Sequence, residues 1–291
     1  MNVDFALQAP DDLAGALDML AQGGAGVALL AGGTNLIVDM RAGRHRPEGV
    51  IALERVQELR GIDCNGARIS VGGRATVTDL LHSPGIAAAA PSLVDAARCF
   101  AGQMVRNAAT VAGNIACGSP AADLVPPLMS LDATVTLASK AGERSVPLDQ
   151  YFLGYRHDVR RRDELITRVL WPRLPARSHN VFYKLARRRG DAITVTGVAV
   201  TLCMANGVCD KARIALGAVA PTVVRAKKAE ALLTGTRLTP AVIDAAARQA
   251  VEECSPIDDI RASADYRRHA VEVLTRRLVS QAWEQLTHRQ G

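Results

Sequence analysis

The chain has 291 residues, of which 48% are hydrophobic and 22% are charged, a composition typical of a folded globule and too apolar for a disordered protein. The length predicts about two domains, at ~100–200 residues per domain. The most apolar stretch, 192–205, is shorter than the ~20 residues that a membrane-spanning helix needs.

Charge and cysteine content exclude further classes. The first twelve residues show no basic segment followed by an apolar run, so no secretory signal is visible, and six scattered cysteines without a CxxC pair predict reduced thiols in a cytoplasmic protein. The net charge of +6 comes with few aromatic residues, which disfavours a nucleic-acid groove. The arginines clustered at 160–162 and 187–189 indicate either a solvated face or a surface that docks an acidic partner protein.

The first predicted helix begins at 10–12 and ends at the two glycines 23–24, with leucines at helical spacing between them. A short buried strand is predicted over 27–31, and it breaks at Gly32-Gly33-Thr34-Asn35. An amphipathic segment, 36–41, then leads to a second strand at 50–53.

The pattern changes near residue 57. Two short strands are predicted within 59–70 around Asn65-Gly66, a dipeptide that readily supplies the positive φ angles of a tight hairpin. The sequence Thr76-Val77-Thr78-Asp79 is a capping box that opens a helix. The remaining predicted elements of this part are an alanine-rich helix over about 86–101 and strands within 134–148 and 164–171.

The last third reads as a separate unit of strands followed by helices. Strands are predicted at 181–186, 193–204 and 209–219, and helices at about 225–233, 239–254 and 265–286. Three strands followed by three helices predict an antiparallel sheet backed by helices, in the α+β class, and not a doubly wound parallel sheet.

Several common catalytic motifs are absent. The sequence has no GxGxxG after a strand, no GxxxxGK[ST], no HExxH and no GxSxG. A Rossmann nicotinamide site, a P-loop, a zinc site and a serine nucleophile elbow are therefore not supported.

Two glycine-containing segments remain as candidate binding loops. Gly32 and Gly33 follow a strand, where adjacent glycines can aim successive N–H groups at one anion, although such a pair is often only a turn. The second segment, 110–114, is read as a turn that combines a hydroxyl, a glycine and an amide. Together the two turns could hold the two phosphates of a dinucleotide from either side.

Asp123 follows the second segment closely and has two interpretations. It is either an acid in the first turn of a helix that starts at Pro120, or a carboxylate that accepts a hydrogen bond from a sugar or ribityl hydroxyl. Lys184 also has two interpretations, because it stands alone among apolar neighbours in a chain with few lysines. It is either a functional cation or a lysine whose head group reaches solvent from an edge strand.

Four segments, taken in order, resemble the FAD-binding signatures of a known family. They are LLAGGTNLIVDMR (29–41), FAGQMVRNAATVAGNIACGSPAADLVPPLMSLDA (100–133), GYR (154–156) and KLARRRGD (184–191). The family is that of the flavin subunits of xanthine dehydrogenase/carbon monoxide dehydrogenase-type molybdenum hydroxylases. Its second turn usually reads T-x-G-G-N, and this chain departs from it at Ala112, which slightly restricts the loop but still allows close backbone approach.

The resemblance implies a fold and a set of cofactor contacts. It implies a two-part FAD-binding region, 1–57 and 58–176, followed by a C-terminal α+β domain, 177–291, with a three-stranded antiparallel sheet backed by helices. The residues implied to contact FAD are Leu29, Leu30, Ala31, Gly32, Gly33, Thr34, Asn35, Leu36, Phe100, Thr110, Val111, Ala112, Gly113, Asn114, Asp123, Ile166 and Lys184.

The resemblance also implies a function. The chain is expected to be the medium subunit of a heterotrimeric enzyme, with FAD as its only cofactor, no metal ligands and no catalytic residues of its own. A large subunit with molybdopterin and a small subunit with [2Fe–2S] clusters are expected as partners, assembled as a dimer of heterotrimers. Electrons would pass from the clusters through FAD to an external acceptor. The alternatives are a stand-alone FAD-dependent reductase of the related fold and a flavin-free scaffold protein.

Overall fold

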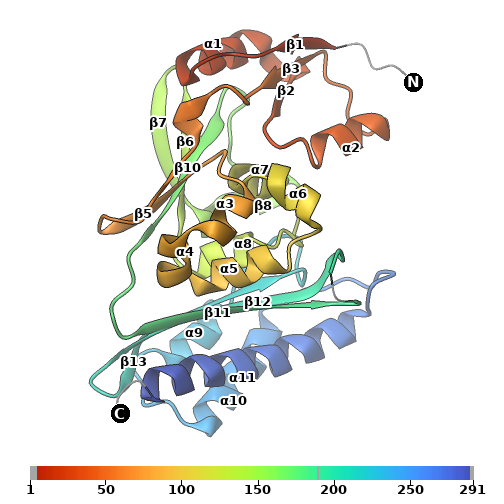
Figure 1. Ribbon diagram of the computed structural model, residues 1–291. Helices are drawn as coiled ribbons and strands as arrows, with labels where there is room; N and C mark the ends of the chain where they lie inside the picture. Colours follow the sequence, from red (N-terminus) through yellow and green to blue (C-terminus); the bar gives the residue numbers. More distant parts are fainter. Residues whose placement is uncertain (1–4, 189, 289–291) are drawn as a thin grey trace.

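The computed structural model describes residues 5–188 and 190–288, which form three parts stacked one on another (Figure 1). The N-terminal part, in red and orange, lies at one end, and the C-terminal part, in blue, lies at the other. Each part is built on its own sheet, and helices accompany every sheet. The α+β class predicted from the order of strands and helices is therefore confirmed.

The N-terminal part is a small parallel sheet of three strands in the order β1-β3-β2, with bounds Ala6–Gln8, Gly49–Ala52 and Val27–Leu30. Helix α1 (Leu13–Gly23) is capped by the Asp12 side chain and packs Leu20 against Ile51. The loop after β2 leaves the carboxyl edge of the sheet and enters α2 (Leu36–Arg41). Ligands commonly bind at this edge of a parallel sheet.

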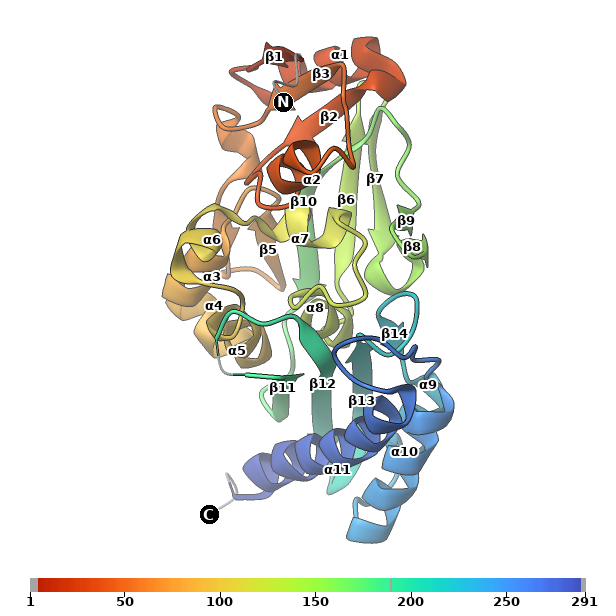
Figure 2. The same ribbon diagram turned by 90° about the vertical axis from the view of Figure 1, so that its right-hand side faces the viewer.

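The middle part is an antiparallel sheet in the order β4-β5-β10-β6-β7, covered by short helices (Figure 2). The strands are β4 (Ile62–Asp63), β5 (Arg68–Gly72), β6 (Thr134–Ser139), β7 (Gly142–Pro147) and β10 (Leu165–Pro172), and the helices are α3 (Val77–His82), α4 (Pro84–Ala89), α5 (Pro91–Arg98), α6 (Gln103–Ala108), α7 (Val111–Ala116) and α8 (Val125–Ser130). Strands β8 (Phe152–Gly154) and β9 (His157–Asp158) form a separate hairpin. The core between sheet and helices contains the fully buried Trp171.

Local predictions in the middle part succeed and fail for identifiable reasons. The capping box at Thr76 is present, with reciprocal hydrogen bonds between Thr76 and Asp79. The single helix predicted over 86–101 is wrong, because Pro91 cannot continue a helix and instead starts α5. The tight turn predicted at Asn65-Gly66 is also wrong. Neither residue has a positive φ, and the loop between β4 and β5 is longer than two residues.

The C-terminal part is an antiparallel sheet in the order β11-β12-β13-β14, with bounds Ser178–Ala186, Thr194–Ala205, Val208–Gly217 and Val224–Arg225. The helices α9 (Lys227–Leu233), α10 (Pro240–Glu252) and α11 (Ala264–His288) follow. The three predicted strands and the helices behind them are confirmed. The fourth strand was not predicted, because two residues are too few to show an alternating pattern.

The C-terminal sheet is covered on both faces. Helices α5 and α8 of the middle part lie on one face, and α9 and α11 lie on the other, with α10 packed against α9 and α11 (Figure 1). β12 has no exposed residue over its length, as expected of a strand with apolar contacts on both sides. This arrangement fixes β11 against the middle part of the molecule.

Charged side chains reinforce the junction between the middle and C-terminal parts. Asp132 accepts hydrogen bonds from Lys211, Arg213 and Arg225, with N–O distances between 2.5 and 2.9 Å. Burial opposes ionisation of this carboxyl, but Lys211 and Arg213 outweigh it and lower its pKa to about 2. Arg225 also pairs with the buried Glu230 at 2.6 Å. The junction is therefore held by a network of ion pairs in which Asp132 stays ionised.

Candidate functional site

The loop between β2 and α2 depends on its two glycines. Gly33 has a φ of +70°, in the left-handed region that favours glycine. At Gly32 a Cβ atom would lie 1.9 Å from the carbonyl oxygen of Ala108. Only a glycine at this position lets the loop pack directly against the end of α6.

This loop offers several open backbone donors. Among the described residues, the N–H groups of Gly32, Gly33, Thr34 and Asn35 have no hydrogen-bond acceptor. Successive N–H groups around a left-handed residue form a concave site that favours anions. The geometry of the loop is therefore suited to a phosphate.

The second candidate loop, 110–114, is the start of a helix and not a turn. Thr110 is the N-cap of α7, and its hydroxyl accepts a hydrogen bond from the N–H of Gly113 at 3.1 Å. The N–H groups of Val111 and Ala112 donate to carbonyl oxygens of the loop before α3. Three donors that a turn would leave open are thus used inside the protein. The first loop therefore has more N–H groups free to bind an anion than the second.

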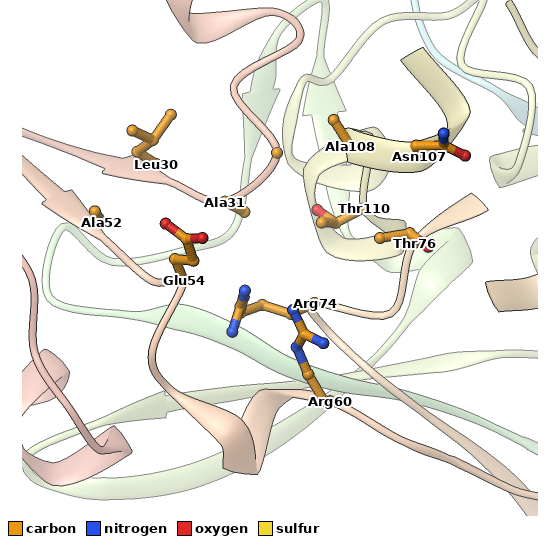
Figure 3. A pocket seen from close by; sticks show the side chains of 11 residues that line it. Leu30, Ala31, Ala52, Glu54, Arg60, Arg74, Thr76, Asn107, Ala108 and Thr110 are labelled. Carbon is orange, nitrogen blue, oxygen red and sulfur yellow. The ribbon is translucent and has the colours of Figure 1, made fainter. Parts of the chain in front are cut away.

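A cavity lies between these two segments (Figure 3). Ala31 and Gly32 line it on one side, and Asn107, Ala108 and Thr110 line it on another. Its volume is about 240 Å³, below the ~300–1,000 Å³ of pockets that enclose a drug-sized ligand. The cavity therefore has room for one end of a dinucleotide and not for a whole one.

Asp123 and Lys184 form a buried ion pair away from this cavity. The Lys184 Nζ atom lies 2.6 Å from Oδ2 of Asp123 and also donates to the carbonyl of Cys99. The other carboxylate oxygen accepts a hydrogen bond from the Thr194 hydroxyl at 2.5 Å. Burial raises the pKa of Asp123, although the Lys184 ammonium opposes the shift.

This pair overturns two of the alternatives left open by the sequence. Lys184 does lie on the edge strand β11, but its side chain is only 4% exposed, so its head group does not reach solvent. Asp123 is not in the first turn of a helix, because α8 begins at Val125. The structure joins the two residues that the sequence singled out separately.

The other predicted residues are spread along one side of the middle part. Asn114 accepts a hydrogen bond from the N–H of Leu124 and so connects α7 to the Asp123 turn. Phe100 is half-buried beside Cys99, and the buried Ile166 places its carbonyl against Gly73, next to Ala112. Of the predicted contacts, those that line the cavity are Leu30, Ala31, Gly32 and Thr110, and those that do not are Leu29, Gly33, Thr34, Asn35, Leu36, Phe100, Val111, Ala112, Gly113, Asn114, Asp123, Ile166 and Lys184.

Sequence reasoning missed three charged residues that line the cavity. They are Glu54, Arg60 and Arg74 (Figure 3). A signal for Arg74 was available, since it is the only charged residue in the stretch 69–78, just as Lys184 stands alone among apolar neighbours.

The arginine clusters are partly used inside the protein. Arg160 forms a paired contact with Asp158, and Arg161 bonds the buried Glu164. The Arg160 side chain is therefore used within the chain, whereas that of Arg161 is 61% exposed and keeps a face open to solvent. Arg187 donates to the carbonyl of Ile260, and Arg189 lies outside the described residues.

The described residues contain neither a metal-binding cluster nor a membrane-spanning helix. No group of three or more histidine, cysteine, aspartate or glutamate side chains there could hold a metal ion. No helix in the same part of the chain is both long and apolar enough to cross a membrane.

Comparison with family models covers nearly the whole chain. Residues 3–174 match the FAD binding domain in molybdopterin dehydrogenase, and residues 181–282 match the CO dehydrogenase flavoprotein C-terminal domain.

Individual relatives agree with these matches. The chain is 33% identical over 279 residues to the carbon monoxide dehydrogenase medium chain of Hydrogenophaga pseudoflava, covering 96% of this chain and 97% of the relative. It is 29% identical over 272 residues to a putative xanthine dehydrogenase FAD-binding subunit of Escherichia coli K12, covering 93% of each. A solved structure of the Hydrogenophaga carbon monoxide dehydrogenase superposes with a TM-score of 0.94 at 34% identity, over 98% of this chain and 99% of that one.

Proposed function

The chain belongs to the FAD-binding subunits of the molybdopterin dehydrogenase family, which are parts of oxidoreductases, and from this premise we propose its role. It is the FAD-carrying electron-transfer subunit of a heterotrimeric molybdenum hydroxylase. It passes electrons from [2Fe–2S] clusters of a small partner subunit through FAD to an external acceptor. A large partner subunit with molybdopterin oxidises the organic substrate, and the complex is a cytoplasmic dimer of heterotrimers.

The open N–H groups of the glycine loop are the structural observation that supports this proposal most directly. The glycine loop presents four N–H groups without protein acceptors, and its first residues border the same cavity as Thr110. Anionic oxygens of a pyrophosphate would satisfy these donors. The donor set of the described residues therefore fits FAD, whose isoalloxazine ring supplies the electron-carrying chemistry when the cofactor is bound.

The residues near Asp123 suit the other end of the cofactor. In the proposal, the open N–H groups of Gly32–Asn35 bind the pyrophosphate, and the segment Thr110–Asn114 lies against it on the other side. Asp123 accepts a hydrogen bond from a ribityl or ribose hydroxyl. Phe100 and Lys184 flank the flavin side of the site, and Ile166 contacts the cofactor beside Gly73. The burial of the Lys184–Asp123 pair supports this assignment, because buried ionised pairs fix their own geometry and can position a neighbouring group.

The proposed domains are 1–57, 58–176 and 177–291, and the separate sheets of the three parts support this division. The partner assignment is supported by the relatives, which include medium chains of dehydrogenases from several organisms and a subunit of a 6-hydroxypseudooxynicotine dehydrogenase complex.

Co-expression with the neighbouring open reading frames tests the assembly. We expect this chain to elute together with one larger and one smaller polypeptide, with FAD, molybdenum and iron present in the same fractions. A control expression that omits the small subunit is expected to retain FAD but to show no flavin reduction by organic substrates. Steady turnover of an organic substrate by the isolated chain would contradict the proposal and favour the stand-alone reductase.

A further inference from the structure

The cavity between the glycine loop and α6 has a cationic end. Arg60 and Arg74 lie next to each other there, and Glu54 faces them from the end of β3 (Figure 3). The side chains of Arg60 and Glu54 form no ion pair with any residue that the structure describes. The three groups carry a net charge of +1, so the cavity lacks one negative charge.

Arg74 is buried with most of its donors unused. The residue is 8% exposed. Within the described residues its side chain makes one hydrogen bond, from Nη1 to the carbonyl oxygen of Val56 at 3.1 Å. A guanidinium has five N–H donors, so most of them remain available to the cavity. Burial and the neighbouring Arg60 lower the pKa of Arg74, while Glu54 partly opposes this shift.

The backbone holds Arg74 rigidly at this place. Its N–H donates to the carbonyl of Leu59 at 2.8 Å. The two preceding residues, Gly72 and Gly73, have no room for a Cβ, since each would place it 2.4 Å from a backbone carbonyl oxygen. A fixed and buried cation that Glu54 balances only in part is costly to maintain, and an anionic ligand would offset that cost.

We propose that Arg74, with Arg60 beside it, binds a phosphate of the adenylate end of FAD and so selects FAD over flavins that lack this end. The inference rests on the proposed function. The cavity is too small for a whole dinucleotide, and it contains no aromatic side chain against which a flavin ring could stack. Its cationic lining suits a phosphate, which arginine binds through forked hydrogen bonds. The buried Asp123 and Lys184 lie outside the cavity, on the side assigned to the flavin.

Flavin titration of the cofactor-free chain tests the role of Arg74. The variant R74Q removes the charge but keeps a donor for the Val56 carbonyl, and R74K keeps the charge. R248Q, an exposed site on α10, is the matched control. Wild type and variants are titrated with FAD, FMN and ADP at low and high salt, with binding followed by fluorescence.

We expect R74Q to weaken FAD binding by about 10- to 150-fold, the range that corresponds to ~1.5–3 kcal/mol for a hydrogen bond to a charged group. FMN binding is expected to stay within about twofold, R74K to recover most of the FAD affinity, and R248Q to match wild type. The salt dependence of FAD binding is expected to be smaller in R74Q than in wild type.

Unchanged FAD affinity in R74Q would overturn the inference. Equal weakening of FAD and FMN would also overturn it, because that result indicates a structural role through Val56. The wild-type chain could bind ADP, with a dependence on Arg74, and fail to bind FAD. That result would contradict the proposed function but support an anion site at Arg74. If the wild-type chain bound neither FAD nor ADP, both would fail.

Discussion

Replacing Gly32 by alanine is expected to remove most of the FAD affinity. The added Cβ would lie 1.9 Å from the carbonyl oxygen of Ala108 and 2.7 Å from its carbon, both backbone atoms that cannot rotate away. The glycine loop would have to move off α6 and would carry its open N–H groups with it. Forcing atoms into packed contacts costs ~1–3 kcal/mol, so we expect FAD affinity to fall about tenfold or more.

The measurement is FAD titration of the cofactor-free G32A chain, together with its thermal unfolding. G66A is the matched control, since a Cβ there makes only an ordinary contact at 3.6 Å, and its FAD affinity is expected to equal that of wild type. An alanine at position 32 that left FAD affinity intact would show that this loop does not hold the phosphates.

Replacing Asp123 by alanine is expected to lower both stability and FAD affinity. The change leaves the Lys184 ammonium, 4% exposed, without its carboxylate, and removes the acceptor of the Thr194 hydroxyl. Breaking one side of a buried ion pair costs ~3–5 kcal/mol of unfolding free energy. Loss of a hydrogen bond to the ligand would cost FAD binding a further ~1–3 kcal/mol.

A double variant separates these two effects. With Lys184→Met added to Asp123→Ala, no unpaired charge remains buried, so urea unfolding of the cofactor-free chain is expected to show most of the stability restored. FAD affinity is expected to stay low, because the hydroxyl acceptor is still missing. If the double variant regained wild-type FAD affinity, Asp123 would have no contact with the cofactor.

Much of the fold is predictable because local chemistry specifies it. The capping box at Thr76 and the strands of the last third follow from their residues alone. Prediction fails where the same short sequence adopts two different conformations. Asn206-Gly207 adopts positive φ angles in the tight connection between β12 and β13, whereas Asn65-Gly66 does not. Two residues connect β12 and β13, whereas a longer loop connects β4 and β5, and the dipeptide alone does not encode this loop length.

The candidate site was only partly predictable, because its contacts cross between distant segments. The family resemblance, carried by four segments together, is confirmed by the family models. Residue types alone could not pair Asp123 with Lys184, which are 61 positions apart. They also could not show that the donors after Thr110 are used inside the protein, since their acceptors lie before α3.

The central claim is that this chain carries FAD as its own electron-transfer group. The most direct test is cofactor analysis of the purified chain, in which released flavin is identified by chromatography and iron and molybdenum are measured in the same sample. We expect one FAD per chain and neither metal. A chain that bound no flavin even when titrated with FAD, or that contained stoichiometric iron, would contradict it.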